Sequence, residues 1–125
     1  MDKKSKRTQT AVSRLERGQN ILEMVTSLKV NSPYSFYDLS DDKQNTLLEW
    51  CRQLEKKEKI NKKHTSYGLK HIFEKNNFYI TNGAFKGAMV AAGFKVSDET
   101  ELNWQFNISE KSVKDVLKKR KEFLR

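Results

Sequence analysis

The sequence predicts a mainly α fold with a small β element. In several segments apolar residues recur at intervals of three and four, as they do on one face of a helix. Only residues 102–108 alternate strictly between apolar and amide side chains, which predicts a strand. A length of 125 residues favours one compact domain. Within it we expect a flexible basic arm at 1–8, a helical part at 9–62 and a core with a basic C-terminal helix at 63–125.

The composition is strongly basic, with a net charge of +9 and a pI near 9.7. A surplus of this size favours a polyanionic partner, which lysines bind through phosphate contacts. The alternative is that the lysines merely keep helical faces solvated. The chain has one cysteine, Cys51, which excludes a disulfide framework and is expected to be a small core residue. With no apolar run long enough to span a bilayer, we expect a cytoplasmic protein and no membrane partner.

The N-terminal part contains two candidate docking surfaces. Residues 9–30 have a helical apolar stripe, and Pro33 ends that helix. Several large side chains follow Pro33 in a connecting segment. Both groups would pack on the protein's own core or bind a partner. The partner-binding candidates are Leu15, Leu22, Val25, Tyr34, Phe36 and Tyr37.

The next helix is predicted to begin after the N-cap residue Ser40. Its apolar face repeats at helical spacing from Leu47 to Leu54, and cations at 56–59 are expected to complete its C-terminus. Residues 61–63 then form the exit.

A short helix is predicted to begin at Thr65 or Ser66 and to end near Lys75, with a left-handed C-cap at Asn76 or Asn77. Residues 78–80 are expected to be extended.

Another helix is predicted to begin at Thr81 or Asn82 and to stop at Gly93. Gly87 inside this helix destabilises it relative to alanine, so a close neighbour is expected there. The small residues on this face would let another helix approach tightly.

The predicted strand has one apolar face, and its other face consists of Asn103, Gln105 and Asn107. Its partner is expected to be residues 78–80 or the segment around 94–96. Ser109 then caps the last and most basic helix.

No catalytic or metal-binding constellation is evident. His64 and His71 are seven positions apart and have no cysteine near them in sequence. Residues 81–87 lack the Gly-Lys-Ser/Thr ending of a phosphate-binding loop. We therefore expect a non-enzymatic protein without a metal or cofactor.

The order helix, connection, helix, strand predicts a winged helix-turn-helix-like core flanked by basic helices. In that geometry the start of the second helix would enter the major groove of DNA, and the amide face of the strand would lie along the wing. We therefore expect the nucleic-acid partner to be DNA rather than RNA. The nucleic-acid-binding candidates are Lys70, Lys75, Thr81, Asn82, Lys86, Lys95, Asn103, Gln105, Lys118, Lys119 and Lys121.

Three segments, SYGLKHIFE, FYITNGAFKGAMVAAGF and ELNWQFNIS, resemble a family of small helix-turn-helix-like proteins. Phages and integrative or mobile elements of low-GC Gram-positive bacteria encode that family. The resemblance covers roughly residues 65–109 and transfers no catalytic residue. It implies an accessory protein of a mobile element that would be the partner of a replication enzyme.

Two functional hypotheses follow. The first is a nucleic-acid-binding accessory protein that contacts phosphates through lysine-rich helices. It predicts that a Lys86→Glu, Lys118→Glu variant loses affinity and keeps its fold. The second is a protein-binding accessory subunit or inhibitor of a nucleic-acid enzyme, such as a replication polymerase, a helicase or a host defence nuclease.

Overall fold

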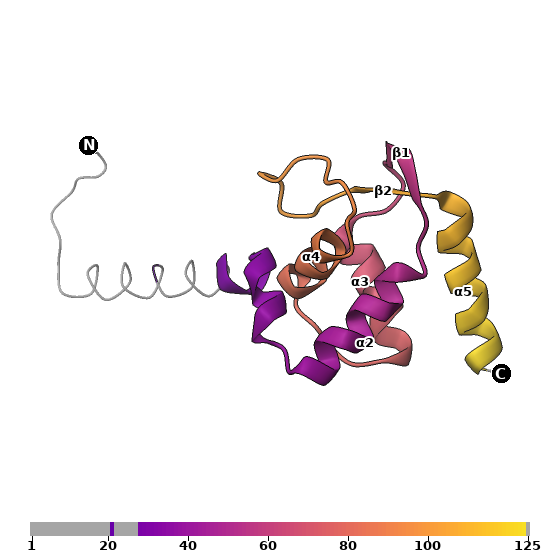
Figure 1. Ribbon diagram of the computed structural model, residues 1–125, viewed down its shortest axis with the longest axis horizontal. Helices are drawn as coiled ribbons and strands as arrows, with labels where there is room; N and C mark the ends of the chain where they lie inside the picture. Colours follow the sequence, from indigo (N-terminus) through magenta and orange to yellow (C-terminus); the bar gives the residue numbers. More distant parts are fainter. Residues whose placement is uncertain (1–20, 22–27, 125) are drawn as a thin grey trace, which may run out of the picture.

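A computed structural model describes residue 21 and residues 28–124, with side chains described up to residue 119. The elements follow the order η1, a 3-10 helix (Pro33–Asp38), α2 (Asp41–Arg52), β1 (Lys56–Asn61), α3 (Ser66–Asn76), α4 (Asn82–Ala91), β2 (Phe106–Ile108) and α5 (Glu110–Leu124) (Figure 1). The predicted mainly α fold with a small β element is confirmed at this level. None of the helices in the described part of the chain combines the length and apolar character needed to cross a bilayer.

The N-terminal predictions are tested only at their end. The basic arm at 1–8 and the apolar stripe with Leu15, Leu22 and Val25 lie outside the described residues. Residues 28–30 are helical, as predicted, the helix extends one residue further to Asn31, and Pro33 begins η1.

Four helix starts were predicted from capping residues, and all four are confirmed. The side chains of Ser40, Thr65, Thr81 and Ser109 each accept a hydrogen bond from the backbone N–H three residues later. The predicted stop after α4 is also confirmed, because Gly93 has a φ of 93°, which glycine adopts without strain.

The predicted left-handed cap after α3 is wrong. Asn77 has a φ of −133°. Its side-chain amide instead donates to the carbonyl of Phe73 at 3.0 Å, so a side chain satisfies the helix end.

Helix α4 forms the centre of the molecule and contacts η1, α2 and α3. Phe85, Ala88 and Met89 on this helix are fully buried. Trp50 of α2 packs edge-on against both Phe73 of α3 and Phe85. The predicted apolar faces of these three helices therefore meet in one core.

The small residues of α4 admit a close neighbour, as predicted, and that neighbour is the start of η1. A methyl group on Gly83 would overlap the backbone of Ser32. A methyl group on Gly87 would overlap the carbonyl oxygen of Pro33 and the Cβ of Phe36. The backbone of η1 thus occupies the space that alanine side chains would need.

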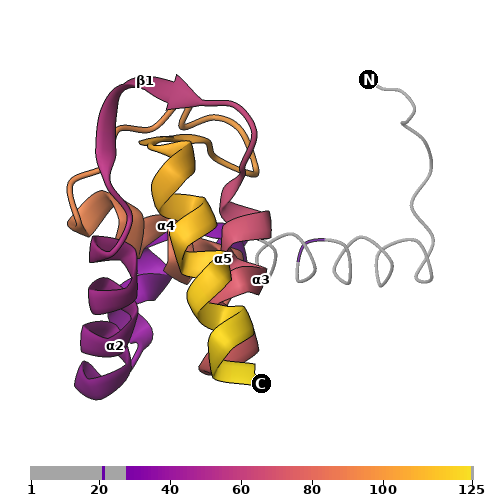
Figure 2. The same cartoon turned by 90° about the vertical axis from the view of Figure 1, so that its right-hand side faces the viewer.

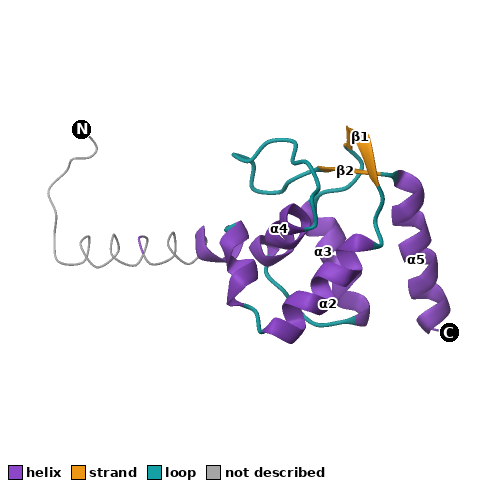
Figure 3. Ribbon diagram, in the orientation of Figure 1, coloured by secondary structure: helices purple, strands orange, loops and turns teal. Residues whose placement is uncertain are grey.

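The predicted strand is confirmed only at its end. Residues 102–105 belong to the long loop that joins α4 to β2 (Figure 3). β2 pairs antiparallel with β1, and Phe106 also bridges Val96 on its other side. One expected partner, the segment around 94–96, therefore contributes a single bridge, whereas residues 78–80 form no strand.

The residues of β1 were assigned to the end of the preceding helix, and this prediction is wrong. α2 ends at Arg52, and Leu54 turns its side chain into the core. The lysines that follow are compatible with a helix C-terminus, but pairing with β2, about fifty residues later in the chain, holds them extended.

The pairing between β1 and β2 is strongly bulged. Lys56 lies opposite Ile108, and Asn61 lies opposite Phe106. Residues 57–60 therefore bow away from β2, with only Asn107 opposite them. Figure 2 shows the resulting curve of β1 at one end of the molecule. We refer to residues 56–63 as the β1 arch.

Candidate nucleic-acid interface

The start of α4 is inaccessible to DNA. Every residue from Asn82 to Met89 is buried, and Asn82 and Lys86 expose only 8% and 3% of their surface. A recognition helix must present the side chains of its first turns to the groove. The prediction that Asn82 and Lys86 point toward DNA is therefore wrong, and no winged helix-turn-helix is confirmed.

Lys86 acts as an internal brace. Its Nζ donates to the carbonyl oxygen of Leu102 at 2.9 Å and lies 4.5 Å from the ring centroid of Trp104. Burial lowers the pKa of Lys86. The ammonium thus ties the loop after α4 to that helix.

Asn82 holds the same loop from the side. Its Nδ2 lies 3.1 Å from both the carbonyl oxygen of Leu102 and Oδ1 of Asn103, and its Oδ1 accepts from Ser66 at 3.0 Å. The hydroxyl of Thr81 is used as the α4 cap. The Asn82 amide, which was predicted to bind nucleic acid, is therefore engaged inside the protein.

The amide face of the predicted strand also differs from expectation, because much of it points inward. Asn107 is buried, donates to the carbonyl of Lys57 at 2.8 Å and accepts from the backbone N–H of Lys95 at 2.6 Å. Gln105 donates to the carbonyl of Lys62 at 3.2 Å. These side chains replace backbone hydrogen bonds that the bulge in β1 leaves unmade.

Lys70 was predicted to contact phosphates at the surface, and this prediction is wrong, because Lys70 is 4% exposed and does not reach outward. Its Nζ lies 2.7 Å from Oε2 of Glu74 and sits over the rings of Tyr67 and Tyr79, at 5.6 and 4.8 Å from their centroids. Desolvation of Glu74 is outweighed by its bonds from Lys70 and the backbone N–H of Ile80, so the pKa of Glu74 is lowered.

The other predicted lysines remain compatible with a surface role. Lys75, Lys95, Lys118 and Lys119 are exposed. The side chain of Lys121 lies outside the part of the chain that the structure describes.

The β1 arch carries functional candidates that the sequence analysis missed. Its five lysines are all exposed, and none forms an ion pair with another described residue. Glu55 and Glu58 are the only acids from residue 55 to residue 63. The available signal was the run KKEKINKK, which was interpreted as a helix end. The arch lysines are Lys56, Lys57, Lys59, Lys62 and Lys63.

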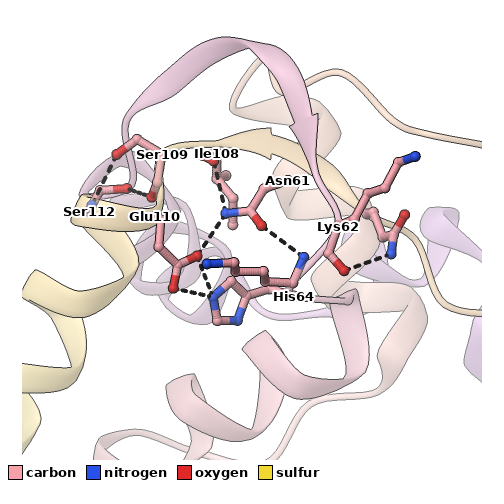
Figure 4. Close-up of polar contacts among 9 residues, drawn as sticks. Asn61, Lys62, His64, Ile108, Ser109, Glu110 and Ser112 are labelled. Atoms are coloured by element: carbon pink, nitrogen blue, oxygen red, sulfur yellow. Dashed lines mark hydrogen bonds and ion pairs between the residues drawn. The ribbon is translucent and has the colours of Figure 1, made fainter.

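Hydrogen bonds hold the arch at both of its ends and also at Lys57, its second residue. The carbonyl of Glu55 accepts from the N–H of Ser109 at 2.8 Å. At the other end, Asn61 donates to the carbonyl of Ile108 at 3.2 Å and to Oε1 of Glu110 at 3.0 Å (Figure 4). Asn107 adds its bond to Lys57. The lysines therefore stand on a fixed backbone.

Glu110 joins the arch to the start of α5. Besides Asn61, it contacts Nε2 of His64, which lies 2.9 Å from Oε1 (Figure 4). The hydrogen bond from Asn61, opposed by desolvation and helped by His64, holds the pKa of Glu110 below its usual value. No three His, Cys, Asp or Glu side chains among the described residues are grouped as a metal site.

A cavity of about 400 Å³ lies beside α3, the α3–α4 connection and residues 102–103. Tyr67, Tyr79, Lys70, Asn82 and Asn103 are among the residues that line it. Most of its lining comes from the segments SYGLKHIFE, FYITNGAFKGAMVAAGF and ELNWQFNIS. The structure thus brings together three segments that are separate in the sequence.

The docking candidates divide in the same way as the lysines. Phe36 is 2% exposed and packs in the core, so its assignment as a partner contact is wrong. Tyr34 and Tyr37 on η1 are 78% and 64% exposed. The free thiol of Cys51 is buried, as expected for a core residue, and burial raises its pKa.

No protein-family model matches the chain, and neither a curated protein nor a solved structure shows significant similarity to it.

Proposed function

We propose that the protein is a non-enzymatic nucleic-acid-binding accessory protein that contacts phosphates through the β1 arch. The observation that carries the proposal is the exposure of five lysines on strand β1 and the turn after it, without an ion-pair partner among the described residues. Charges held in this way release counterions when they meet a phosphate backbone, which drives association.

The bracing of the arch supports the same function. Its backbone is fixed by hydrogen bonds from Asn61 to Ile108 and Glu110. Further bonds join the Glu55 carbonyl to the N–H of Ser109 and the Lys57 carbonyl to the side chain of Asn107. A fixed backbone lowers the entropy that would be lost on binding. Lys95 is also exposed, and its backbone N–H is bonded to Asn107, so it adds a charge beside the arch.

The experiment compares two double variants with the same change in charge. Lys57→Gln, Lys59→Gln removes charge from the arch. Lys29→Gln, Lys43→Gln removes it from the segment before η1 and from the start of α2, at exposed positions that are not among the nucleic-acid-binding candidates. Binding of fluorescent DNA and RNA is measured by anisotropy over a range of salt concentrations.

We expect the arch variant to bind roughly tenfold more weakly and to lower the slope of log K against log salt by about two. The control variant should change the affinity and the slope much less. Equal effects of the two variants would show that the arch is not the contact surface. No binding by the unmodified protein at low salt would overturn the function itself.

The resemblance to proteins of phages and integrative elements adds context to the proposal. It favours DNA of a mobile element as the polyanion, bound beside a replication enzyme. Comparing DNA and RNA of the same sequence in the anisotropy experiment tests this choice.

A second candidate, a protein-binding accessory subunit or inhibitor, is favoured by the exposure of Tyr34 and Tyr37. Aromatic rings are enriched where proteins meet. A Tyr34→Ala, Tyr37→Ala variant should then fail to co-purify with a nucleic-acid enzyme that the unmodified protein retains. Retention of that enzyme by the variant would count against this surface.

A further inference from the structure

The cavity beside α3 is bordered by two exposed aromatic rings. Tyr67 and Tyr79 are 52% and 72% exposed, although the described phenylalanines are all buried or half-buried. Both rings surround the same ammonium, that of Lys70. Large rings held at a surface in this way offer area for stacking at low entropic cost.

Lys70 at this cavity is only partly satisfied. An ammonium has three N–H donors, and the described residues supply one hydrogen-bond acceptor, Oε2 of Glu74. The side chain is nevertheless buried and lines the cavity. Besides this bond, the ammonium contacts the rings of Tyr67 and Tyr79, so an acceptor on a bound ligand would add a hydrogen bond to it.

The cavity also contains polar groups that can form hydrogen bonds with the edge of a ligand's ring. The Oδ1 of Asn103 accepts from Asn82, which leaves the exposed Asn103 amide N–H groups facing a ligand or solvent. His71 uses Nδ1 toward Glu74 at 3.3 Å, and its Nε2 makes no hydrogen bond with a described residue. Stacking faces with edge donors are the elements by which proteins hold unstacked bases.

The arch leads directly to this cavity. The carbonyl of Lys62 accepts a hydrogen bond from the side chain of Gln105, which is two residues from Asn103. Lys63 precedes Tyr67 by four residues. The backbones of Ser66 and Trp104 are also joined, by a 2.7 Å hydrogen bond. Phosphates on the arch and a base in the cavity would therefore belong to neighbouring parts of one ligand.

We propose that the Tyr67–Tyr79 cavity binds a nucleobase, stacked on the tyrosine rings and hydrogen-bonded by Lys70 and Asn103. This inference rests on the proposed function and narrows it to nucleic acid with unpaired bases, because a base in a duplex is stacked between its neighbours. The cavity volume of about 400 Å³ falls within the range of small-ligand sites. The same chemistry would accept a free nucleotide.

The test compares Tyr79→Ala and Tyr79→Phe in the cavity with Tyr34→Ala on η1. All three variants change exposed tyrosines, and thermal unfolding checks that the fold is kept. Anisotropy is measured with a single-stranded oligonucleotide and with a duplex of the same sequence. A further arm titrates nucleoside monophosphates against tyrosine fluorescence, using both the unmodified protein and the arch variant.

We expect Tyr79→Ala to weaken single-strand binding by about 5- to 100-fold and to leave duplex binding nearly unchanged. Tyr79→Phe keeps the stacking face and should retain single-strand affinity, as should Tyr34→Ala. An oligonucleotide with 5-iodouracil should photo-crosslink to Tyr67 or Tyr79, as identified by mass spectrometry.

The outcomes separate this inference from the proposed function. If the arch variant loses affinity while Tyr79→Ala does not, the cavity inference is overturned and the proposed function stands. If Tyr79→Ala loses equal affinity for the single strand and for the duplex, the cavity inference is also overturned. Monophosphate binding that survives in the arch variant, without oligonucleotide binding, identifies a free nucleotide as the ligand and overturns the proposed function alone.

Discussion

Lysines in this protein occupy two opposite environments. On α3 and α4, Lys70 and Lys86 are almost completely buried, and their ammonium groups bond to Glu74 and to the carbonyl of Leu102. On the β1 arch the lysines are exposed and lack ion-pair partners among the described residues. Lys86 ties the loop after α4 to that helix, and Lys70 lines the Tyr67–Tyr79 cavity, whereas the arch lysines are free to contact a polyanion. Net charge alone does not distinguish these roles, but each is open to test by mutation.

The largest expected effect comes from reversing a buried charge. Lys86→Glu would place a carboxylate against the carbonyl of Leu102 and should destabilise the protein by about 3–5 kcal/mol. This replaces the expectation that a variant containing this change keeps its fold. Urea unfolding followed by circular dichroism measures the difference.

The control for this change is Lys59→Glu on the arch. Because Lys59 is exposed, its reversal should shift stability by about 0.5 kcal/mol or less. If both variants unfold at the same urea concentration, the division into interior and arch lysines fails.

A smaller effect is expected from the close packing of α4. Gly87→Ala improves helix propensity, yet its methyl group would overlap Pro33 and Phe36, so we expect a net loss of about 3 kcal/mol. Gly68→Ala in α3 is the matched control, because its new methyl group would meet only the Thr65 hydroxyl, at 3.9 Å. That control should stabilise the protein by about 0.5–1 kcal/mol. Opposite signs in thermal unfolding are the predicted result.

The arch itself is expected to depend on one buried amide. Asn107→Ala removes the partners of the Lys57 carbonyl and the Lys95 N–H, which should destabilise the protein by about 2 kcal/mol. Amide hydrogen exchange should accelerate at Lys95 and along the arch. Unchanged exchange would mean that Asn107 does not brace the arch. Asn45→Ala, which alters an exposed amide on α2, serves as the control.

The smallest expected effect is pH-dependent. Because the pKa of Glu74 is lowered in the folded protein, its contribution is complete above pH 4.5 and is lost as the pH falls through the folded pKa. Glu74→Gln should therefore be less stable by about 1 kcal/mol at neutral pH. The difference should shrink in acid. A difference that stays constant between neutral pH and pH 3 would contradict this assignment, and Glu49→Gln on the exposed face of α2 controls for general charge effects.

The helices were the most predictable part of the fold, because their signals are local. Ser40 and Thr65 satisfy backbone N–H groups three residues away, so the sequence itself contains both partners. Strand β1 could not be predicted in this way. Its lysine-rich residues are compatible with a helix end, and only pairing with a distant segment makes them a strand.

The candidate site was harder to predict than the fold. Asn107 follows the alternation expected of an outward amide face, but the bulge in β1 turns its side chain into a substitute for backbone hydrogen bonds. Tyr67 and Tyr79 were not singled out as site residues, because nothing in their local sequence places them around the same lysine.

By itself, the sequence determined where four helices begin, that the helix ending near Gly93 stops there, and that a close neighbour approaches Gly87. The helix starts and the stop depend on hydrogen bonds and steric limits within a few residues of the chain. The neighbour of Gly87, by contrast, is Pro33 with Phe36, about fifty residues away in the chain. The tertiary structure alone decided which lysines face solvent. Lys86 is buried because Leu102 and Trp104 fold over it, whereas the arch lysines are exposed on a strand that pairs only with β2 and on the turn after it. Burial depends on contacts between distant segments, and the charge of a lysine is the same in either place.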